Sequence, residues 1–284
     1  MGDSFLQNST NMQNNVEPLL DTGDVRQTVS RLLSRFSTIS LEEMDAVKLM
    51  NRIDTKYLID SLQLFRLLQM ASDQYFVVKI DNERISPYST IYFDTADNEM
   101  YMMHHNRKLN RFKVRMRSYL NSGNTFLEIK RKNNKGRTTK MRIPIDPNCF
   151  QTKCLGDLEQ KFVFEKTPYY TVLSKAQIQN TFYRITLVDK DLSERVTLDI
   201  DLKFKNLCSD ASKGVDGLVI VEMKQDGACK SHFANYLKEM KVTSGSMSKY
   251  CLGMTLVNPD LKSNRFRIKL RKINKITDRY YAAI

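Results

Sequence analysis

The sequence predicts an α+β protein in which helices surround an antiparallel sheet of about eight or nine strands. Arg111 to Leu120 and Thr125 to Lys132 both alternate apolar and charged residues, which is typical of half-buried strands. The turn-forming segment from Asn121 to Asn124 joins them and favours a hairpin. Helical periodicity appears on both sides of this strand-rich region. With 284 residues and 41% hydrophobic content, the chain can bury a large core.

The N-terminal part of the chain is expected to become helical after an unstructured start. Residues 1–24 are rich in Asn, Gln and Ser, and they predict a disordered lead-in rather than a signal peptide. Apolar residues recur at helical spacing from Val25 to Phe36. Ser40 with Glu43 predicts the capping box of a second short helix.

The main body, residues 25–258, is predicted to be one domain made mostly of strands. The expected strands are Arg52 to Ile59, Tyr75 to Ile80, Tyr88 to Phe93, Arg111 to Leu120, Thr125 to Lys132, Arg137 to Ile143, Thr181 to Val188, Glu194 to Leu202 and Leu218 to Lys224. The expected helices begin near Ser61, span Leu158 to Lys175, and lie around Phe233 to Met240 and Ser246 to Leu256. Residues 259–284 form a basic tail, either a solvated extension or an electrostatic arm for a membrane or a partner.

Composition narrows the classes of function. Lys and Arg number 45 against 32 Asp and Glu, a net charge of +13, which indicates an anionic partner. The five cysteines show no CxxC spacing, which suits a reducing compartment and argues against a zinc site. His104, His105 and His232 are not expected to bind a metal. No run of about 18 apolar residues occurs, so we expect a cytoplasmic protein without a transmembrane segment.

Charged residues fall on one face of several predicted strands. Lys113, Arg115 and Arg117 share a face because side chains alternate along a strand. The same rule groups Glu128 with Lys130, Lys140 with Arg142, Arg195 with Asp199 and Asp201, and Glu222 with Lys224. This pattern fits an open sheet with its charged face in water. It also fits a sheet that curls so that the charges line an interior, and such clustered cations would need an oligoanion to neutralise them.

A set of short motifs follows one order along the chain. It reads Arg52-Ile-Asp-Thr-Lys56-Tyr57, Tyr92-Phe93-Asp94-Thr95, Arg107, Arg115-Met-Arg117-Ser-Tyr119, Phe126-Leu-Glu128-Ile-Lys130, Lys140-Met-Arg142, Tyr183-Arg184, Arg195-Val-Thr-Leu-Asp199-Ile-Asp201, Val221-Glu222-Met-Lys224 and Ser248-Lys249-Tyr250. This set resembles the polyphosphate polymerase domain of the vacuolar transporter chaperone (VTC) family, a branch of the CYTH-like triphosphate tunnel metalloenzymes. The resemblance covers about Arg35 to Leu256.

The resemblance implies an eight-stranded antiparallel tunnel that holds the triphosphate of ATP and a growing polyphosphate chain. The catalytic cations would be Lys56, Arg115, Arg117, Lys130, Arg184, Arg195 and Lys249. The remaining substrate-binding residues would be Arg107, Lys140, Arg142, Lys224 and Ser248. Glu222 falls on the position that binds the metal, Mn²⁺ or Mg²⁺.

The implied reaction is attack by a chain-terminal phosphate oxygen on the γ-phosphorus of ATP, with release of ADP. Hydrolytic relatives begin their first strand with Glu-x-Glu-x-Lys, whereas this chain has Arg52-x-Asp54-x-Lys56, and the departure favours polymerisation. Two alternatives stay open: a polyanion-binding module without chemistry, and an inorganic triphosphatase. Nucleic acid is not expected, because Phe112 and Phe126 fit core positions and the chain has no Trp. Any translocation of polyphosphate would need a membrane-protein partner.

Overall fold

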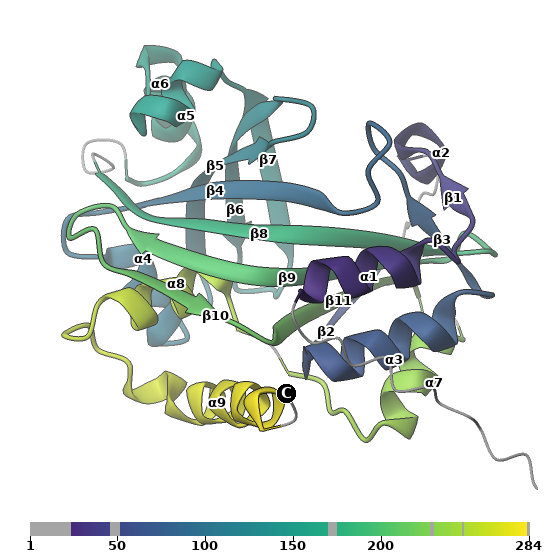
Figure 1. Cartoon of the computed structure of the whole chain (residues 1–284). Coiled ribbons are helices and arrows are strands. Elements are labelled where there is room, and N and C mark those ends of the chain that lie inside the picture. The colour runs from purple at the N-terminus through teal and green to yellow at the C-terminus, as the bar shows by residue number, and fades with distance from the viewer. Residues whose placement is uncertain (1–23, 46–51, 170–174, 228–229, 246, 283–284) are drawn as a thin grey trace, which may run out of the picture.

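The computed structural model of the chain describes residues 24–45, 52–169, 175–227, 230–245 and 247–282. A single large sheet organises the molecule (Figure 1). Its main path is antiparallel throughout and runs in the order β2 (Arg52–Asp60), β11 (Leu218–Asp226), β9 (Glu194–Asn206), β8 (Lys175–Asp189), β4 (Ser86–Asp94), β5 (Arg111–Tyr119), β6 (Thr125–Lys132) and β7 (Thr138–Pro144). The predicted α+β antiparallel fold is confirmed.

Three short strands raise the count to an 11-stranded sheet. β1 (Thr38–Ile39) pairs in parallel with β3 (Tyr75–Val78), and β3 pairs with the far end of β8. β10 (Ser212–Val215) pairs with β9. The two-residue β1 and the Gly-containing β10 are too short to give a readable alternation, which is why the sequence did not predict them.

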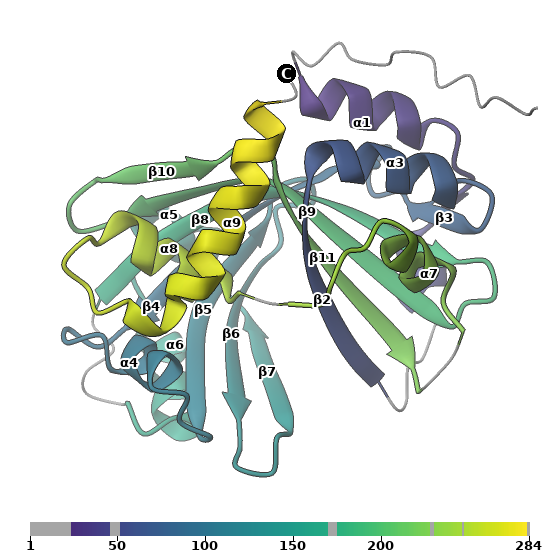
Figure 2. The ribbon, with the colours of Figure 1, turned by 90° about the horizontal axis from the view of Figure 1, so that it is seen from below.

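The sheet is strongly curved, as the view in Figure 2 shows. The arm of β2 and β11 faces the arm of β6 and β7 across the concave side. β2 and β7 are the two ends of the main path, and within the described ranges no backbone pairing joins them. In these ranges the sheet is therefore strongly curved and open, and we call its concave side the trough.

Helices cover the convex face of the sheet in two groups. α1 (Val25–Leu33), α3 (Ser61–Ala71) and α7 (His232–Glu239) pack on one arm, where apolar residues such as Leu64 and Leu198 form a core cluster. α5 (Pro147–Thr152) and α6 (Asp157–Lys166) lie over the other arm, against Val114 and Leu127. The apolar rows of the alternating strands therefore face outward onto helices, and the charged rows face inward.

Part of the concave face is also filled with apolar side chains. α4 (Glu99–His105), α8 (Lys249–Val257), the 3₁₀ turn η1 (Asn264–Phe266) and α9 (Arg267–Tyr281) contribute to this cluster. Leu58 and Ile220 belong to this cluster. Leu58 lies two residues from Lys56 on β2, and Ile220 lies two residues from Glu222 on β11, so each shares a strand face with that charged residue. The concave face thus has an apolar portion under α8 and α9 and a charged portion beyond the N-terminus of α8.

The helix predicted over Leu158 to Lys175 is wrong in its second half. α6 ends at Lys166, and its C-cap Thr167 is extended with φ −140° and ψ 160°. Thr167 precedes Pro168, and a residue before proline avoids the helical region. Lys175 already begins β8, which is longer than the strand predicted from Thr181.

The prediction that Asp201 shares a face with Arg195 and Asp199 is also wrong. Asp201 has a φ of 51°, and the pairing of β8 with β9 shifts register in this region. Such a bulge breaks the two-residue alternation. Asp201 therefore reaches Arg26 of α1 on the convex side, with Nε and Oδ2 3.4 Å apart.

The two ends of the chain differ from the expectation in different ways. The predicted disordered lead-in, apart from Asp24, lies outside the described residues. The basic tail, by contrast, is mostly the ordered helix α9, and Ile273, Ile276 and Tyr280 of α9 are buried. The capping box of α2 (Leu41–Asp45) is confirmed, because the amides and side chains of Ser40 and Glu43 bond reciprocally.

Candidate functional site

Among the described residues, three carboxylates of the charged part of the trough each contact two cationic side chains. The first is Glu222 of β11. Lys56 on the neighbouring β2 is its direct register partner and forms an ion pair with it. Lys224 approaches from two residues along the same strand, with Nζ 3.6 Å from Glu222 Oε2. Burial and repulsion from Lys224 lower the pKa of Lys56 to about 8.

Asp199 of β9 forms the second cluster and is 2% exposed. Arg184, its register partner on β8, donates from Nε and a terminal nitrogen over 2.6 and 2.8 Å to the two carboxylate oxygens. Lys249, the first residue of α8, forms an ion pair with the same carboxylate. Burial opposes ionisation of Asp199, but Arg184 and Lys249 hold its pKa below the usual value.

Glu128 of β6 forms the third cluster and is completely buried. Arg115 of β5 donates from Nε to Glu128 Oε2 over 2.7 Å, and Lys140 of β7 forms an ion pair with the other oxygen. Burial again opposes ionisation, yet Arg115 and Arg117 keep the pKa of Glu128 low. A carboxylate without access to water is stable here only because it is paired.

The cations outnumber the carboxylates, so positive charge is left over. Arg117 is 7% exposed, donates to Thr90 Oγ1 over 3.3 Å, and has its pKa lowered by burial and by Arg115. Lys130 of β6 is the register partner of Lys113 on β5 and of Lys140 on β7, and repulsion from Arg115, together with burial, lowers its pKa to about 6. Depressed lysine pKa values mark a cavity whose field is already positive. Such a cavity favours an entering oligoanion.

Aromatic rings support several of these cations on the concave face. The Arg184 guanidinium lies 5.1 Å from the centroid of the Tyr88 ring, and the Lys249 ammonium lies 4.5 Å from that of Phe182. Arg142 lies 4.7 Å from the ring of Phe126. The prediction that Phe126 is a core residue is therefore wrong, because Phe126 shares the strand face of Glu128 rather than that of Leu127.

Two predicted residues, Arg195 and Arg142, lie at the margins of the trough. Arg195 of β9 donates to Met44 Sδ of α2 over 3.7 Å, and Met44 belongs to a small apolar cluster with Val78 and Val188. Arg142 is exposed on the edge strand β7. The trough thus extends from the end at Arg195, past the three carboxylates, to the N-terminus of α8.

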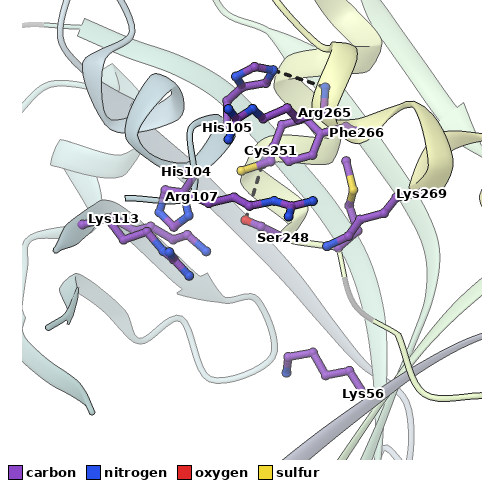
Figure 3. A pocket seen from close by; sticks show the side chains of 12 residues that line it. Lys56, His104, His105, Arg107, Lys113, Ser248, Cys251, Arg265, Phe266 and Lys269 are labelled. Carbon is purple, nitrogen blue, oxygen red and sulfur yellow. Dashed lines mark hydrogen bonds between the residues drawn. The ribbon is translucent and has the colours of Figure 1, made fainter. Parts of the chain in front are cut away.

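The opposite end opens into a cavity of about 460 Å³ (Figure 3). Three predicted residues, Lys56, Arg107 and Ser248, line it. Ser248 is the N-cap of α8, and its hydroxyl accepts the Cys251 N–H over 3.4 Å. The structure therefore gathers most of the predicted residues along one continuous surface.

Sequence reasoning missed some contributors to this surface. Glu128 and Asp199 were placed on the charged face, but their role as counter-ions was not predicted. Charge balance along the strands was the signal that could have shown it. Arg265 and Lys269 from the C-terminal region also line the cavity, and nothing in the loosely patterned tail indicated this.

A metal ion would find few protein ligands here. Within the described residues, no group of three or more His, Cys, Asp or Glu side chains could hold one. Mg²⁺ and Mn²⁺ often bind through one or two carboxylates together with substrate phosphates and water. Glu222, with 21% of its side chain exposed in the trough, fits that kind of site.

A curved antiparallel sheet with an excess of buried cations on its concave face is suited to an anionic ligand. The chain belongs to the VTC domain family, because the model of that family, the VTC domain, matches residues 51–258. It is thus a polyphosphate-related tunnel enzyme. No curated protein sequence matches the chain. No helix among the described residues is both long and apolar enough to cross a membrane.

Several solved structures are similar to this chain at low identity. One is a proposed adenylate cyclase from Vibrio parahaemolyticus, with 12% identity and a TM-score of 0.42, covering 72% of this chain and 99% of the other. A Hippeastrum protein, described as a proposed adenylyl cyclase with dominant triphosphatase activity, has 15% identity and a TM-score of 0.45, with coverage of 72% and 95%. PH1819 from Pyrococcus horikoshii has 12% identity and a TM-score of 0.39, with coverage of 72% and 98%.

Proposed function

We propose that the chain polymerises inorganic polyphosphate from ATP. A terminal oxygen of the polyphosphate chain attacks the γ-phosphorus of ATP. The new P–O bond lengthens the chain by one phosphate, the bond from the γ-phosphorus to the β–γ bridging oxygen breaks, and ADP leaves with that electron pair. Phosphoryl transfer of this kind needs in-line positioning and charge neutralisation rather than a covalent nucleophile.

The observation that carries this proposal is the excess of cations on one buried surface. Arg115, Arg117 and Arg184 are each largely enclosed, and Arg suits bidentate contacts with phosphate oxygens. We assign the transferring phosphoryl group to seven cations: Lys56, Arg115, Arg117, Lys130, Arg184, Arg195 and Lys249. The flanking phosphates would contact Arg107, Lys140, Arg142, Lys224 and Ser248.

The carboxylates make this surface ready for its ligand. Each carboxylate holds its cations in orientation on the concave face before phosphate oxygens arrive. Lys140 and Lys56 are the most accessible of the paired cations, with 39% and 33% of their side chains exposed. We infer that their ammonium groups turn from the carboxylate to phosphate on binding.

Glu222 is the residue that would hold a divalent metal. Held by Glu222, Mg²⁺ or Mn²⁺ would supply positive charge for the transferring phosphoryl group. Lys56 and Lys224 would then direct their charge toward phosphate instead of Glu222. Glu222 would thus contact Lys56 and Lys224 in the absence of ligand and the metal in its presence. These two roles explain why a carboxylate is needed among so many cations.

The test is to incubate the purified chain with ATP and Mn²⁺ and to resolve the products on a gel stained for polyphosphate. Glu222→Ala is run beside the wild type, and Glu165→Ala serves as the control because Glu165 lies exposed on α6 beside Lys166. We expect a ladder of polymer with ADP from the wild type and from the control, and loss of both from Glu222→Ala.

The other outcomes would each point to a different function. Free phosphate without polymer would indicate an inorganic triphosphatase. Unconsumed ATP, together with retained binding of polyphosphate, would indicate a polyanion-binding module. A ladder that persists in Glu222→Ala would exclude Glu222 as the metal ligand.

A further inference from the structure

The cavity at the end of the trough has a charge pattern unlike that of the trough itself. Its lining includes six cationic residues and no Asp or Glu: Lys56, Arg107, Arg111, Lys113, Arg265 and Lys269. Apart from Lys56, none of these makes an ion pair with a carboxylate in the part of the chain that the structure describes. Cations gathered in this way repel one another unless an anion joins them.

Separate elements bring these side chains together, with Lys56 on β2 and Arg265 on η1. Arg107 follows α4, Arg111 and Lys113 begin β5, and Lys269 belongs to α9. Figure 3 shows Arg107 and Lys113 reaching in from one wall of the cavity and Lys269 from the opposite wall. The N-terminus of α8 at Ser248 lies at the same cavity, and a helix N-terminus favours negative charge.

Neighbouring groups respond to this positive field. Burial, then Lys113 and Arg111, lower the pKa of His104 to about 2, so the ring is neutral. Burial also lowers the pKa of Lys113 to about 8. Cys251 opposes this shift, and repulsion from Arg115 and Arg111 adds to it. The cavity is therefore prepared for an anion by fixed charges rather than by a titrating histidine.

The cavity is continuous with the trough. Lys56 lines it and also pairs with Glu222 in the trough. Lys113, also in the lining, is the register partner of Lys130 on β6. A linear anion bound along the trough would meet these cations next.

Arg265 and Lys269 lie outside the part of the chain that matches the VTC domain, residues 51–258. They are held in place because Phe266 and Ile273 between and after them are buried on the concave face. The Arg265 guanidinium also donates to the backbone oxygen of Asn106 over 3.3 Å, which ties η1 to the end of α4. The C-terminal helix is thus a fixed wall of this cavity and not a free tail.

We propose that this cavity is an additional subsite for linear polyphosphate, in which Arg265 and Lys269 of the C-terminal segment bind the part of the chain that extends beyond the trough. The inference rests on the proposed handling of polyphosphate in the trough. It adds a specificity for length: a short anion is bound by the trough alone, and a long one also contacts the C-terminal segment.

The test compares two ligands and two double variants by calorimetric binding to the full chain without ATP. Arg265→Gln with Lys269→Gln removes the two cavity charges. Arg267→Gln with Arg271→Gln removes two charges from exposed positions of the same helix that do not line the cavity. The ligands are tripolyphosphate and long-chain inorganic polyphosphate, each at fixed ionic strength because such affinities depend strongly on salt.

We expect the cavity variant to weaken long-chain binding by about tenfold, the loss of two charge-assisted contacts of partly exposed side chains, and to change tripolyphosphate binding by less than about twofold. The control variant should change both ligands equally and weakly. Comparing each variant with the wild type for the same ligand cancels the statistical advantage of a long chain. Retained tight binding of long chains by the cavity variant would overturn the proposal.

Two further results would also overturn it, for different reasons. Equal weakening of both ligands would mean that the cavity binds the short anion as well, so no length-dependent subsite exists. Failure of the wild type to bind either ligand would refute the proposed handling of polyphosphate itself, and the inference with it.

Discussion

Glu128→Gln is the substitution that most directly tests the charge arrangement of the trough. It removes a completely buried carboxylate and leaves Arg115, 8% exposed, without its ion-pair partner. Breaking a buried pair by removing one member costs about 3–5 kcal/mol. We expect the low end, about 3 kcal/mol, because Lys140 is 39% exposed at its side chain and can turn to water. For a chain of this size the melting temperature should fall by about 6–12 °C.

The decisive measurement is how much an added anion stabilises the Glu128→Gln variant. Tripolyphosphate can supply the negative charge that Glu128 supplied, so it should stabilise the variant by about 1 kcal/mol more than it stabilises the wild type at the same concentration. Thermal and urea denaturation, each with and without tripolyphosphate, measure both numbers. Glu165→Gln on α6 is the control and should change neither. An unliganded loss below about 0.5 kcal/mol, or no extra gain from tripolyphosphate, would refute the counter-ion role of Glu128.

Two further predictions follow from the same structure. Repulsion from Arg115, followed by burial, lowers the pKa of Lys130 to about 6, so the unfolded chain binds more protons than the folded one between about pH 6 and 10. The free energy of unfolding without ligand should therefore rise with pH in that window. The affinity for tripolyphosphate should fall over the same window as Lys130 loses its charge. In calorimetric titrations across pH this fall in affinity should be shallower for Lys130→Gln, and an equal slope would exclude Lys130 as its cause. Gly253→Ala should lower stability by about 1–3 kcal/mol, because its Cβ would lie 2.4 Å from Phe204 Cδ1; Gly245→Ala, whose nearest contact is at 3.5 Å, should cost much less in the same denaturation assay.

The charged face of the sheet could be predicted because it depends on a local rule. Lys113, Arg115 and Arg117 alternate with apolar residues, and a strand turns alternate side chains to opposite faces. That rule holds wherever the strand is regular, as in β5, β6 and β11. It failed at Asp201, where a positive φ interrupts the alternation. A bulge of this kind is set by how β8 and β9 pair, and the residues next to Asp201 do not indicate it.

The counter-ion pairs and the cavity could not be predicted in the same way. Asp199 meets Lys249 only because α8 enters the concave side of the sheet, and that approach depends on tertiary packing. Gly253 allows it, since α8 lies against Phe204 at a distance that leaves no room for a Cβ. The C-terminal tail shows only weak helical periodicity in the sequence, because its buried residues are few among many cations. These buried residues are Ile273, Ile276 and Tyr280. Their partners on β2 and β11 are far away in the sequence.

Within the described residues, many cations of the trough are paired with carboxylates, whereas most cations of the end cavity are not. Cations that line a cavity repel one another when no anion is bound. Carboxylates such as Glu128 and Asp199 solve this within the trough, where they also hold Arg115 and Arg184 in position. Their cost is competition with phosphate for the same cations, so an anion is gripped less tightly there than bare charges would allow. Under the proposed function, weaker binding suits a surface along which polyphosphate moves, whereas the cavity cations that have no carboxylate partner in the described part of the chain suit a place where the polymer is held.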